Sequence, residues 1–144
     1  MLVHQILKSK ASQGVMTVPP TMLVKEAAKM LAEKRIGTVV VSESGDNADG
    51  ILSERDIVRE LARSGAGCLD KPVSTYMTRK LVTCTGQNSA DEILNQMTDG
   101  RFRHMPVLDN DRLIGLISLG DVVKAQLSEL AMEKDALEGM IMGH

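Results

Sequence analysis

Two stretches of the sequence repeat one polar pattern, in which glycine is followed three residues later by serine and after three more by aspartate. The pattern occurs in "GILSERDIV" and in "GLISLGDVV", as Gly50, Ser53, Asp56 and as Gly115, Ser118, Asp121. Just before an amphipathic helix, the serine and aspartate can form a capping box, in which each side chain accepts a hydrogen bond from a backbone N–H. The same groups can serve a ligand, because a hydroxyl contacts phosphate and a carboxylate accepts hydrogen bonds from a ribose diol.

The glycine is not required by a capping box. A glycine inside a strand is typical of a place where another group approaches the backbone closely. The free N–H groups and the dipole of a helix N-terminus also favour an anion. Together these features favour a nucleotide site over a cap alone.

Both patterns belong to a longer internal repeat. Residues 3–10 align with 73–80, and 16–18 align with 82–84. Each copy then places apolar residues at i, i+3, i+4 and i+7, which predicts a helix with one buried face. These residues are Val24, Ala27, Ala28, Leu31 and Ala90, Ile93, Leu94, Met97. Apolar runs at 36–41 and 104–108 predict strands, so each unit reads strand, helix, strand, strand, helix.

A unit of about 65 residues is near the lower limit for burying a sufficient core alone. We therefore expect two units, residues 1–70 and 71–144, to pack face to face about a pseudo-twofold axis. This packing creates two equivalent clefts, one for each serine and aspartate.

The composition narrows the class of protein. It is 43% apolar and 25% charged, as in globular domains, and no apolar run approaches the length of a membrane span. The first residues lack an export signal, and the two cysteines have no disulfide-scaffold or metal spacing, so we expect a cytoplasmic protein. A net charge of −2 and 1% aromatic residues argue against a nucleic-acid surface.

Catalysis has little support in the sequence. The three histidines have no metal-ligand spacing, and there is no P-loop, G-x-G-x-x-G or nucleophile elbow. We predict a binding protein rather than an enzyme, with no catalytic residue, metal or catalytic cofactor.

From about Val3 to Leu127 the chain resembles a tandem pair of CBS domains, the arrangement called a Bateman module. The two G-x-x-S-x-x-D stretches, the helices "VKEAAKML" and "ADEILNQM", the strand "IGTVVV" and "GRFRHMPVLD" carry the resemblance. It implies an α/β (α+β) fold of two β-α-β-β-α repeats that commonly form dimers. It also implies adenosine ligands in the clefts: AMP first, or ADP, ATP, NAD(H) or S-adenosylmethionine.

The resemblance also assigns roles to individual residues. It implies that Asp56 and Asp121 bind ribose, that Ser53 and Ser118 lie near phosphate, and that Thr17 and Thr83 add hydroxyl contacts. Backbone groups implied to line adenine are those of Gly37, Thr38, Val39 and Met105, Pro106, Val107. Arg103 and His104 match a basic pair that meets phosphate, although on residue type alone they suit a solvated face.

The two repeats are not expected to be identical at the site. We align Thr38 of "KRIGTVVV" with Pro106, which leaves two residues fewer between helix and strand in the first repeat. We therefore expect the two clefts to differ in affinity or in ligand.

The C-terminal segment continues an apolar pattern past the end of the repeat. Steps of four and three join Val123, Leu127, Leu130, Lys134, Leu137, Ile141. A long helix packed on its own module is the first interpretation, and a dimer contact is the second. The predicted function is a homodimeric sensor that signals to a separate protein partner. The alternative is a dimeric interaction protein with vestigial clefts.

Overall fold

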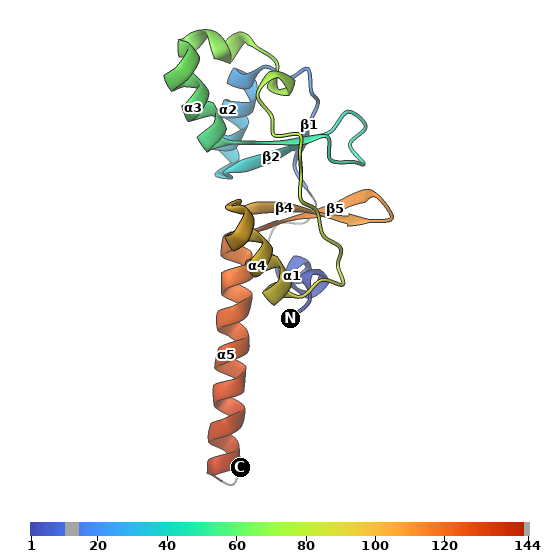
Figure 1. The fold of residues 1–144 in the computed structure, drawn as a ribbon, viewed down its shortest axis with the longest axis vertical. Helices are drawn as coiled ribbons and strands as arrows, with labels where there is room; N and C mark the ends of the chain where they lie inside the picture. The colour runs from blue at the N-terminus through green and yellow to red at the C-terminus, as the bar shows by residue number, and fades with distance from the viewer. Residues whose placement is uncertain (11–14, 143–144) are drawn as a thin grey trace.

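The computed structural model describes residues 1–10 and 15–142. Its two repeats lie one above the other, with their sheets adjacent in the middle of the molecule (Figure 1). Helices α2 (Val24–Lys34) and α3 (Glu54–Ser64) cover the outer side of the first sheet. The outer side of the second sheet is covered by helices α1 (Val3–Ser9) and α4 (Ala90–Gly100) and by the start of α5 (Leu119–Ile141). The predicted pair of α/β repeats is confirmed.

The first sheet has the order β1-β2-β3. Strand β1 (Thr17–Val18) runs parallel to β2 (Thr38–Val41), and β2 pairs antiparallel with β3 (Gly50–Ser53). All four residues of β2 are buried. Val39 and Val41 pack in the first core, so alternation along the strand directs Val40, which is also fully buried, toward the second repeat.

The second sheet is a two-stranded pair of β4 (His104–Asp109) and β5 (Arg112–Ser118), with a register shift between Val107 and Leu108. The expected opening strand around Thr83 is wrong as a strand. Only a single parallel bridge joins Cys84 to Val107, and Thr83 itself is outside any strand.

Two apolar cores hold the repeats, and the predicted helix faces are confirmed in both. In α2, Val24, Ala27 and Leu31 are buried; in α4, Ala90, Ile93 and Met97 are buried. Ala28 and Leu94 are partly buried against the same cores.

Each core is completed by the segment that precedes the other repeat in the chain. Val3 and Ile6 of α1 pack in the core of the second repeat. Val73, in the short 3-10 helix Val73–Thr75, and Met77 pack in the core of the first. A second 3-10 helix, Gly65–Asp70, lies between the repeats in the sequence. The two crossing segments join the repeats into one folded unit, because neither core is complete without them.

The crossing segments explain the two glycines of the repeated motif. A Cβ added at Gly50 would lie 2.5 Å from Met77 Sδ, and one added at Gly115 would lie 2.7 Å from Leu7 Cδ1. The close approach predicted at these glycines is therefore confirmed, but the approaching group is a side chain of the protein itself. The glycines provide no support for a ligand.

The strand registers define which residues are equivalent in the two repeats. Thr38 pairs with Ser53, and His104 pairs with Ser118. Three residues separate helix from strand in both repeats, since α2 ends at Lys34 and α4 at Gly100. Thr38 is thus the equivalent of His104. The predicted alignment of Thr38 with Pro106 and the shorter first segment are wrong.

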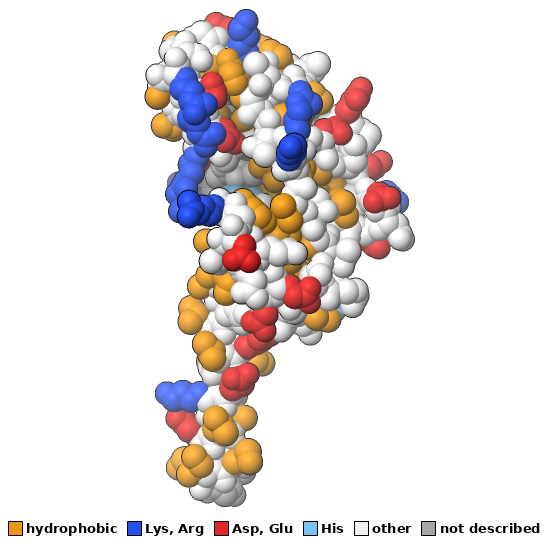
Figure 2. Space-filling view, viewed as in Figure 1, with side chains coloured by type: hydrophobic (Ala, Val, Ile, Leu, Met, Phe, Trp, Pro, Cys, Tyr) orange, Lys and Arg blue, Asp and Glu red, His pale blue; other side chains and the backbone are white. Residues whose placement is uncertain are grey.

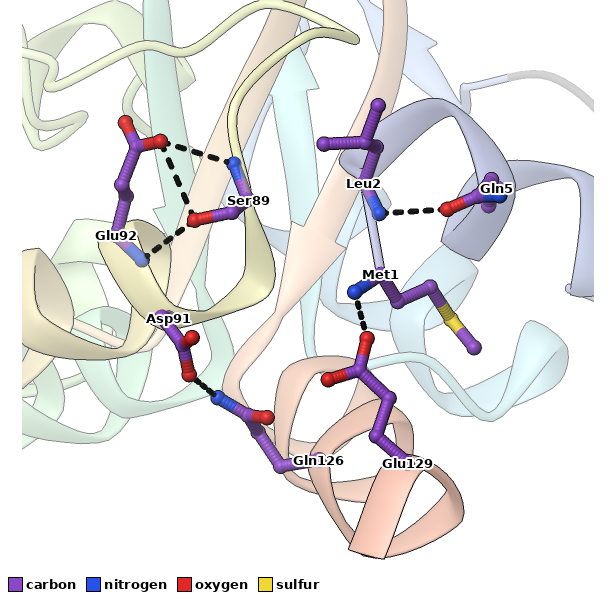
Figure 3. A network of polar contacts seen from close by, with 8 residues as sticks. All are labelled: Met1, Leu2, Gln5, Ser89, Asp91, Glu92, Gln126 and Glu129. Carbon is purple, nitrogen blue, oxygen red and sulfur yellow. Dashed lines mark hydrogen bonds and ion pairs between the residues drawn. The ribbon is translucent and has the colours of Figure 1, made fainter. Parts of the chain in front are cut away.

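Helix α5 begins on its own repeat and then projects away from it (Figure 1). Near its start, Val122 and Ala125 are buried, Gln126 bonds with Asp91 of α4, and Glu129 pairs with the Met1 amino group (Figure 3). Further on, Leu130 is 60% exposed and Ile141 is 84% exposed. The expectation of a terminal helix packed on its own module is therefore wrong for the distal half. Among the described residues, no helix is long and apolar enough to cross a membrane.

Candidate functional site

A cavity of about 650 Å³ lies between the two repeats. One wall consists of the ends of β2 and β3 and the first turn of α3, including Thr38, Ser53 and Asp56. The opposite wall is the connection from α4 to β4, residues 100–104, and the segment 78–82 forms a further part of the lining. The lining residues therefore come from both repeats and from the segment that joins them.

The lining of this cavity is strongly basic. It contains five basic side chains, Arg55, Arg59, Lys80, Arg101 and Arg103, against the two carboxylates of Glu54 and Asp56. Lys and Arg side chains gather around the hollow between the two halves of the molecule (Figure 2). Within the described part of the chain, only Arg59 of these five forms an ion pair, with Asp56 at 3.2 Å. The remaining cations give the cavity the charge that suits an anionic ligand.

Ser53 and Asp56 form a capping box at the start of α3. Ser53 Oγ accepts a hydrogen bond from the Asp56 N–H at 3.2 Å, and Asp56 Oδ2 accepts one from the Ser53 N–H at 2.9 Å. The Glu54 N–H donates to the Gly37 carbonyl at 2.9 Å. The structural interpretation of the motif is thus confirmed, and two N–H groups of the first turn are used within the protein. Any anion here must rely mainly on the basic side chains.

Ser118 and Asp121 form the same box at the start of α5, at 3.1 Å and 2.9 Å. Asp121 Oδ2 also accepts a hydrogen bond from the Lys10 ammonium at 2.9 Å. Burial raises the pKa of Asp121, but the bonds from the Ser118 N–H and from Lys10 outweigh it, so the pKa lies below its usual 3.8. This carboxylate is therefore held in the charged form.

His104 connects the two repeats at the cavity. Its Nδ1 lies 3.2 Å from Thr38 Oγ1, a hydrogen-bonding distance, and both side chains line the cavity. Burial lowers the pKa of His104 below its usual 6.5; Asp121 opposes this shift, while Lys10 and Arg103 add to it. At neutral pH the ring is therefore uncharged and can donate or accept one hydrogen bond at each nitrogen, depending on its tautomer.

Comparison with known proteins identifies this arrangement. The sequence matches the CBS domain family over residues 5–63 and 73–128. The chain belongs to the CBS domain family. The CBS domain-containing protein YhcV of Bacillus subtilis is 31% identical over 123 residues, which cover 85% of this chain and 86% of that protein. Longer CBS proteins of Arabidopsis thaliana also match, but the chain spans only 22% of their length.

Solved CBS structures share the fold. A CBS-domain containing protein from Agrobacterium tumefaciens is 43% identical, with a TM-score of 0.83 over 88% of this chain and 99% of that one. A CBS domain protein from Pyrobaculum aerophilum complexed with AMP is 26% identical, with a TM-score of 0.77 over 92% and 99%. The CBS domain pair of protein MJ0100, in complex with 5′-methylthioadenosine and S-adenosyl-L-methionine, is 25% identical, with a TM-score of 0.76 over 87% and 98%.

The CBS cavity brings together six of the residues singled out in the sequence. They are Gly37, Thr38, Ser53, Asp56, Arg103 and His104. Ser118, Asp121 and Lys10, which bonds to Asp121, do not line this cavity. They mark the equivalent position of the second repeat, where the sequence predicts the second cleft.

The other predicted residues do not line the cavity. Val39, Met105 and Val107 are fully buried in the two cores, so only their backbone could face a ligand. Pro106 is buried opposite Leu116 in the β4–β5 pair. Thr17 is partly buried in β1, and Thr83 is exposed.

Sequence reasoning missed most of the basic lining. Arg55, Arg59, Lys80 and Arg101 line the cavity but are not among the site residues predicted from the sequence. Lys80 could have been found, since the alignment of 73–80 with 3–10 pairs it with Lys10. Arg101 had no such signal, because its place in the cavity depends on how the second repeat packs on the first.

Proposed function

We propose that the protein is a regulatory sensor that binds an adenine nucleotide in the cavity beside Asp56 and signals to a separate protein. The basic lining of this cavity is the observation that carries the proposal. CBS domain proteins are generally regulatory rather than catalytic, so we propose binding without turnover.

The charge of the cavity favours ligands that carry phosphate. Arg55, Arg101 and Arg103 can each donate two hydrogen bonds in the fork geometry that matches phosphate oxygens. S-adenosylmethionine has a sulfonium cation and no phosphate, which fits this lining less well. AMP is therefore the first candidate, followed by ADP, ATP and NAD(H).

Asp56 can supply the acceptor for a ribose diol. Its carboxylate is only 12% exposed and is paired on Oδ1 with Arg59, a side chain that is 52% exposed. Since Arg59 is half exposed and, in the part of the chain that the structure describes, forms only this ion pair, at 3.2 Å, a ribose can displace it from Asp56 into solvent. The Oδ2 atom keeps its bond to the Ser53 N–H.

A dye-reported thermal melt against AMP, ADP, ATP, NAD, NADH and S-adenosylmethionine tests the proposal. Intrinsic fluorescence is unsuitable, because the chain has no Trp and one Tyr. A ligand at about 100 times its Kd adds about 2.7 kcal/mol to stability, a shift of several degrees. We expect a shift with the phosphate ligands and a smaller one with S-adenosylmethionine.

Asp56→Ala and Asp121→Ala form a matched pair of variants. Each removes the same half of a capping box, which lowers the stability of the unliganded protein by roughly 1 kcal/mol. Asp121→Ala should cost more than Asp56→Ala, because it also leaves Lys10 without its carboxylate partner. Only Asp56→Ala should lose the ligand-induced shift. If no phosphate ligand shifts the wild type, the alternative of an interaction protein with vestigial clefts is the better description.

We also propose a cytoplasmic location, which fits the two free, buried cysteines.

We further propose that the protein forms a homodimer. Helix α5 exposes a seam of large apolar side chains, Val123 and Leu127 in its first half and Leu130, Leu137 and Ile141 from its midpoint onward. The distal half of α5 is short enough to be marginal as an isolated helix in water. The same seam on a second copy would match its spacing of four and three residues, which runs through Lys134. Light scattering tests this, with Leu130→Asp/Leu137→Asp expected to be monomeric.

A further inference from the structure

At the predicted second cleft, Asp121 is paired with a cation supplied by the chain itself. The Lys10 ammonium donates to Asp121 Oδ2 and to the Leu116 carbonyl, both at 2.9 Å. The two side chains of this ion pair are only 29% and 22% exposed. The aspartate equivalent to Asp56 is therefore already occupied, and so is a neighbouring backbone acceptor.

The equivalent lysine of the first cleft has a different environment. Leu7 packs over Gly115 as Met77 packs over Gly50, so Lys10 and Lys80, each three residues later, are equivalent. Lys80 is exposed and lines the cavity beside Asp56. The carbonyl of Ile51, the equivalent of Leu116, accepts instead from the Thr78 backbone N–H at 2.8 Å. Lys80 is thus available to a ligand, whereas Lys10 is bonded across its cleft.

The two aspartates also differ in how easily they can be freed. Arg59 contacts Asp56 from the same helix and is half exposed, so it can turn into solvent. Lys10 reaches Asp121 from the segment after α1, is more buried and makes a second hydrogen bond. Lys10 makes two charge-assisted hydrogen bonds, whereas the half-exposed Arg59 makes one to Asp56, so displacing Lys10 costs more.

We propose that Lys10 is a specificity-determining residue that closes the second cleft, so that each chain binds one nucleotide, beside Asp56. A ribose in the second cleft would have to compete with the ammonium for Asp121 and would leave Lys10 without its acceptors. The inference rests on the proposed function, because it concerns which cleft takes the same class of ligand.

Isothermal titration of the full chain with AMP, and in parallel with ATP, tests the inference. The wild type should bind one nucleotide per chain. Lys10→Met, which keeps the length of the side chain but removes the ammonium, should bind two. Adding Asp121→Ala to Lys10→Met should restore one, because the freed ribose acceptor is lost. Lys10→Ala replaces Lys10→Met if the latter does not fold, as judged by its unliganded melt.

Lys80→Met is the matched control. It removes the equivalent ammonium from the first cleft, so it should keep one nucleotide per chain with weaker affinity. Two nucleotides on the wild type, or one on both Lys10 variants, would overturn the inference while the proposed function stands. No binding of either nucleotide to any variant would overturn both.

Discussion

Thr38 and His104 occupy equivalent positions in the two repeats, and their side chains meet, with Oγ1 and Nδ1 3.2 Å apart. Thr38 is the first residue of β2 and His104 the first residue of β4, each opposite the serine of a capping box. The pair therefore lies where the two repeats face each other. The two repeats differ at this position, because the second has a titratable histidine where the first has a threonine. The charges of Asp121 and Lys10 also act on the pKa of His104, which Asp121 raises and Lys10 lowers.

Stability should depend on pH through His104. Its pKa is lowered below 6.5 in the folded protein, chiefly by burial, so below pH 6.5 the unfolded chain binds more protons than the folded one. The stability of the wild type should therefore fall as pH drops from about 6.5 toward the folded pKa, and this loss should be absent above that window. Melting temperatures between pH 7.5 and 5.5 measure it.

His104→Gln is the comparison for the pH experiment. Glutamine keeps a hydrogen-bonding group near Thr38 but does not titrate. The other histidines and the carboxylates are common to both proteins, so the difference between the two curves isolates His104. Parallel curves would show that burial of the ring has no energetic effect.

A comparison of Arg101 with Arg35 separates the effect of charge on AMP binding from the effect of backbone conformation on stability. Both end a helix with a left-handed backbone, at φ 56° and 54°, and only Arg101 lines the cavity. Replacing either with glycine relieves a conformation that costs a side-chain-bearing residue about 1 kcal/mol. Arg101→Gly and Arg35→Gly should both melt at or above the wild-type temperature. Only Arg101→Gly should weaken AMP binding, by about 3- to 10-fold. Equal affinities would remove Arg101 from the site.

Gly50→Ala and Gly115→Ala should destabilise the fold by roughly 1–3 kcal/mol, because the added methyl group overlaps a packed side chain. Gly50→Ala should be the worse variant, since its Cβ also meets the Thr78 backbone carbonyl at 3.0 Å. Gly67→Ala has no atom within 4 Å and serves as the control. Chemical denaturation measures the three.

The glycine experiment has a rescue arm. Leu7→Ala removes the group that Gly115→Ala would meet, so the double variant should be more stable than the sum of the two single changes predicts. If the glycines instead made room for a ligand, alanine would weaken nucleotide binding and leave the unliganded stability unchanged.

The thiol of Cys84 should be inert in the folded protein. Desolvation raises its pKa from 9.0 to about 11, and only 5% of the residue is exposed. At pH 8 its thiolate fraction should be about 100-fold below that of a free cysteine. Alkylation followed by peptide mass spectrometry should label Cys84 in urea and not in buffer. Rapid labelling in buffer would show that the bridge to Val107 opens readily.

Much of the fold could be predicted from the sequence, because it depends on local periodicity. The spacing of apolar residues along the chain predicts the buried faces of α2 and α4 and the order of the elements. The serine and aspartate of each motif are three residues apart and together cap one helix. These relationships involve neighbours along the chain. They hold regardless of how the repeats pack.

The candidate site depended on relationships between distant parts of the chain. Only the tertiary structure showed that Met77 and Leu7 fill the space above the two glycines, and that Lys10 bonds to Asp121 across 111 positions of sequence. Likewise, only packing brings Arg101 and Arg103 opposite Asp56. The sequence by itself determined a duplicated CBS fold with capped helices. The crossing of the segments before each repeat decided where Lys10 and Lys80 lie relative to the two aspartates, because it positions side chains that no local pattern relates.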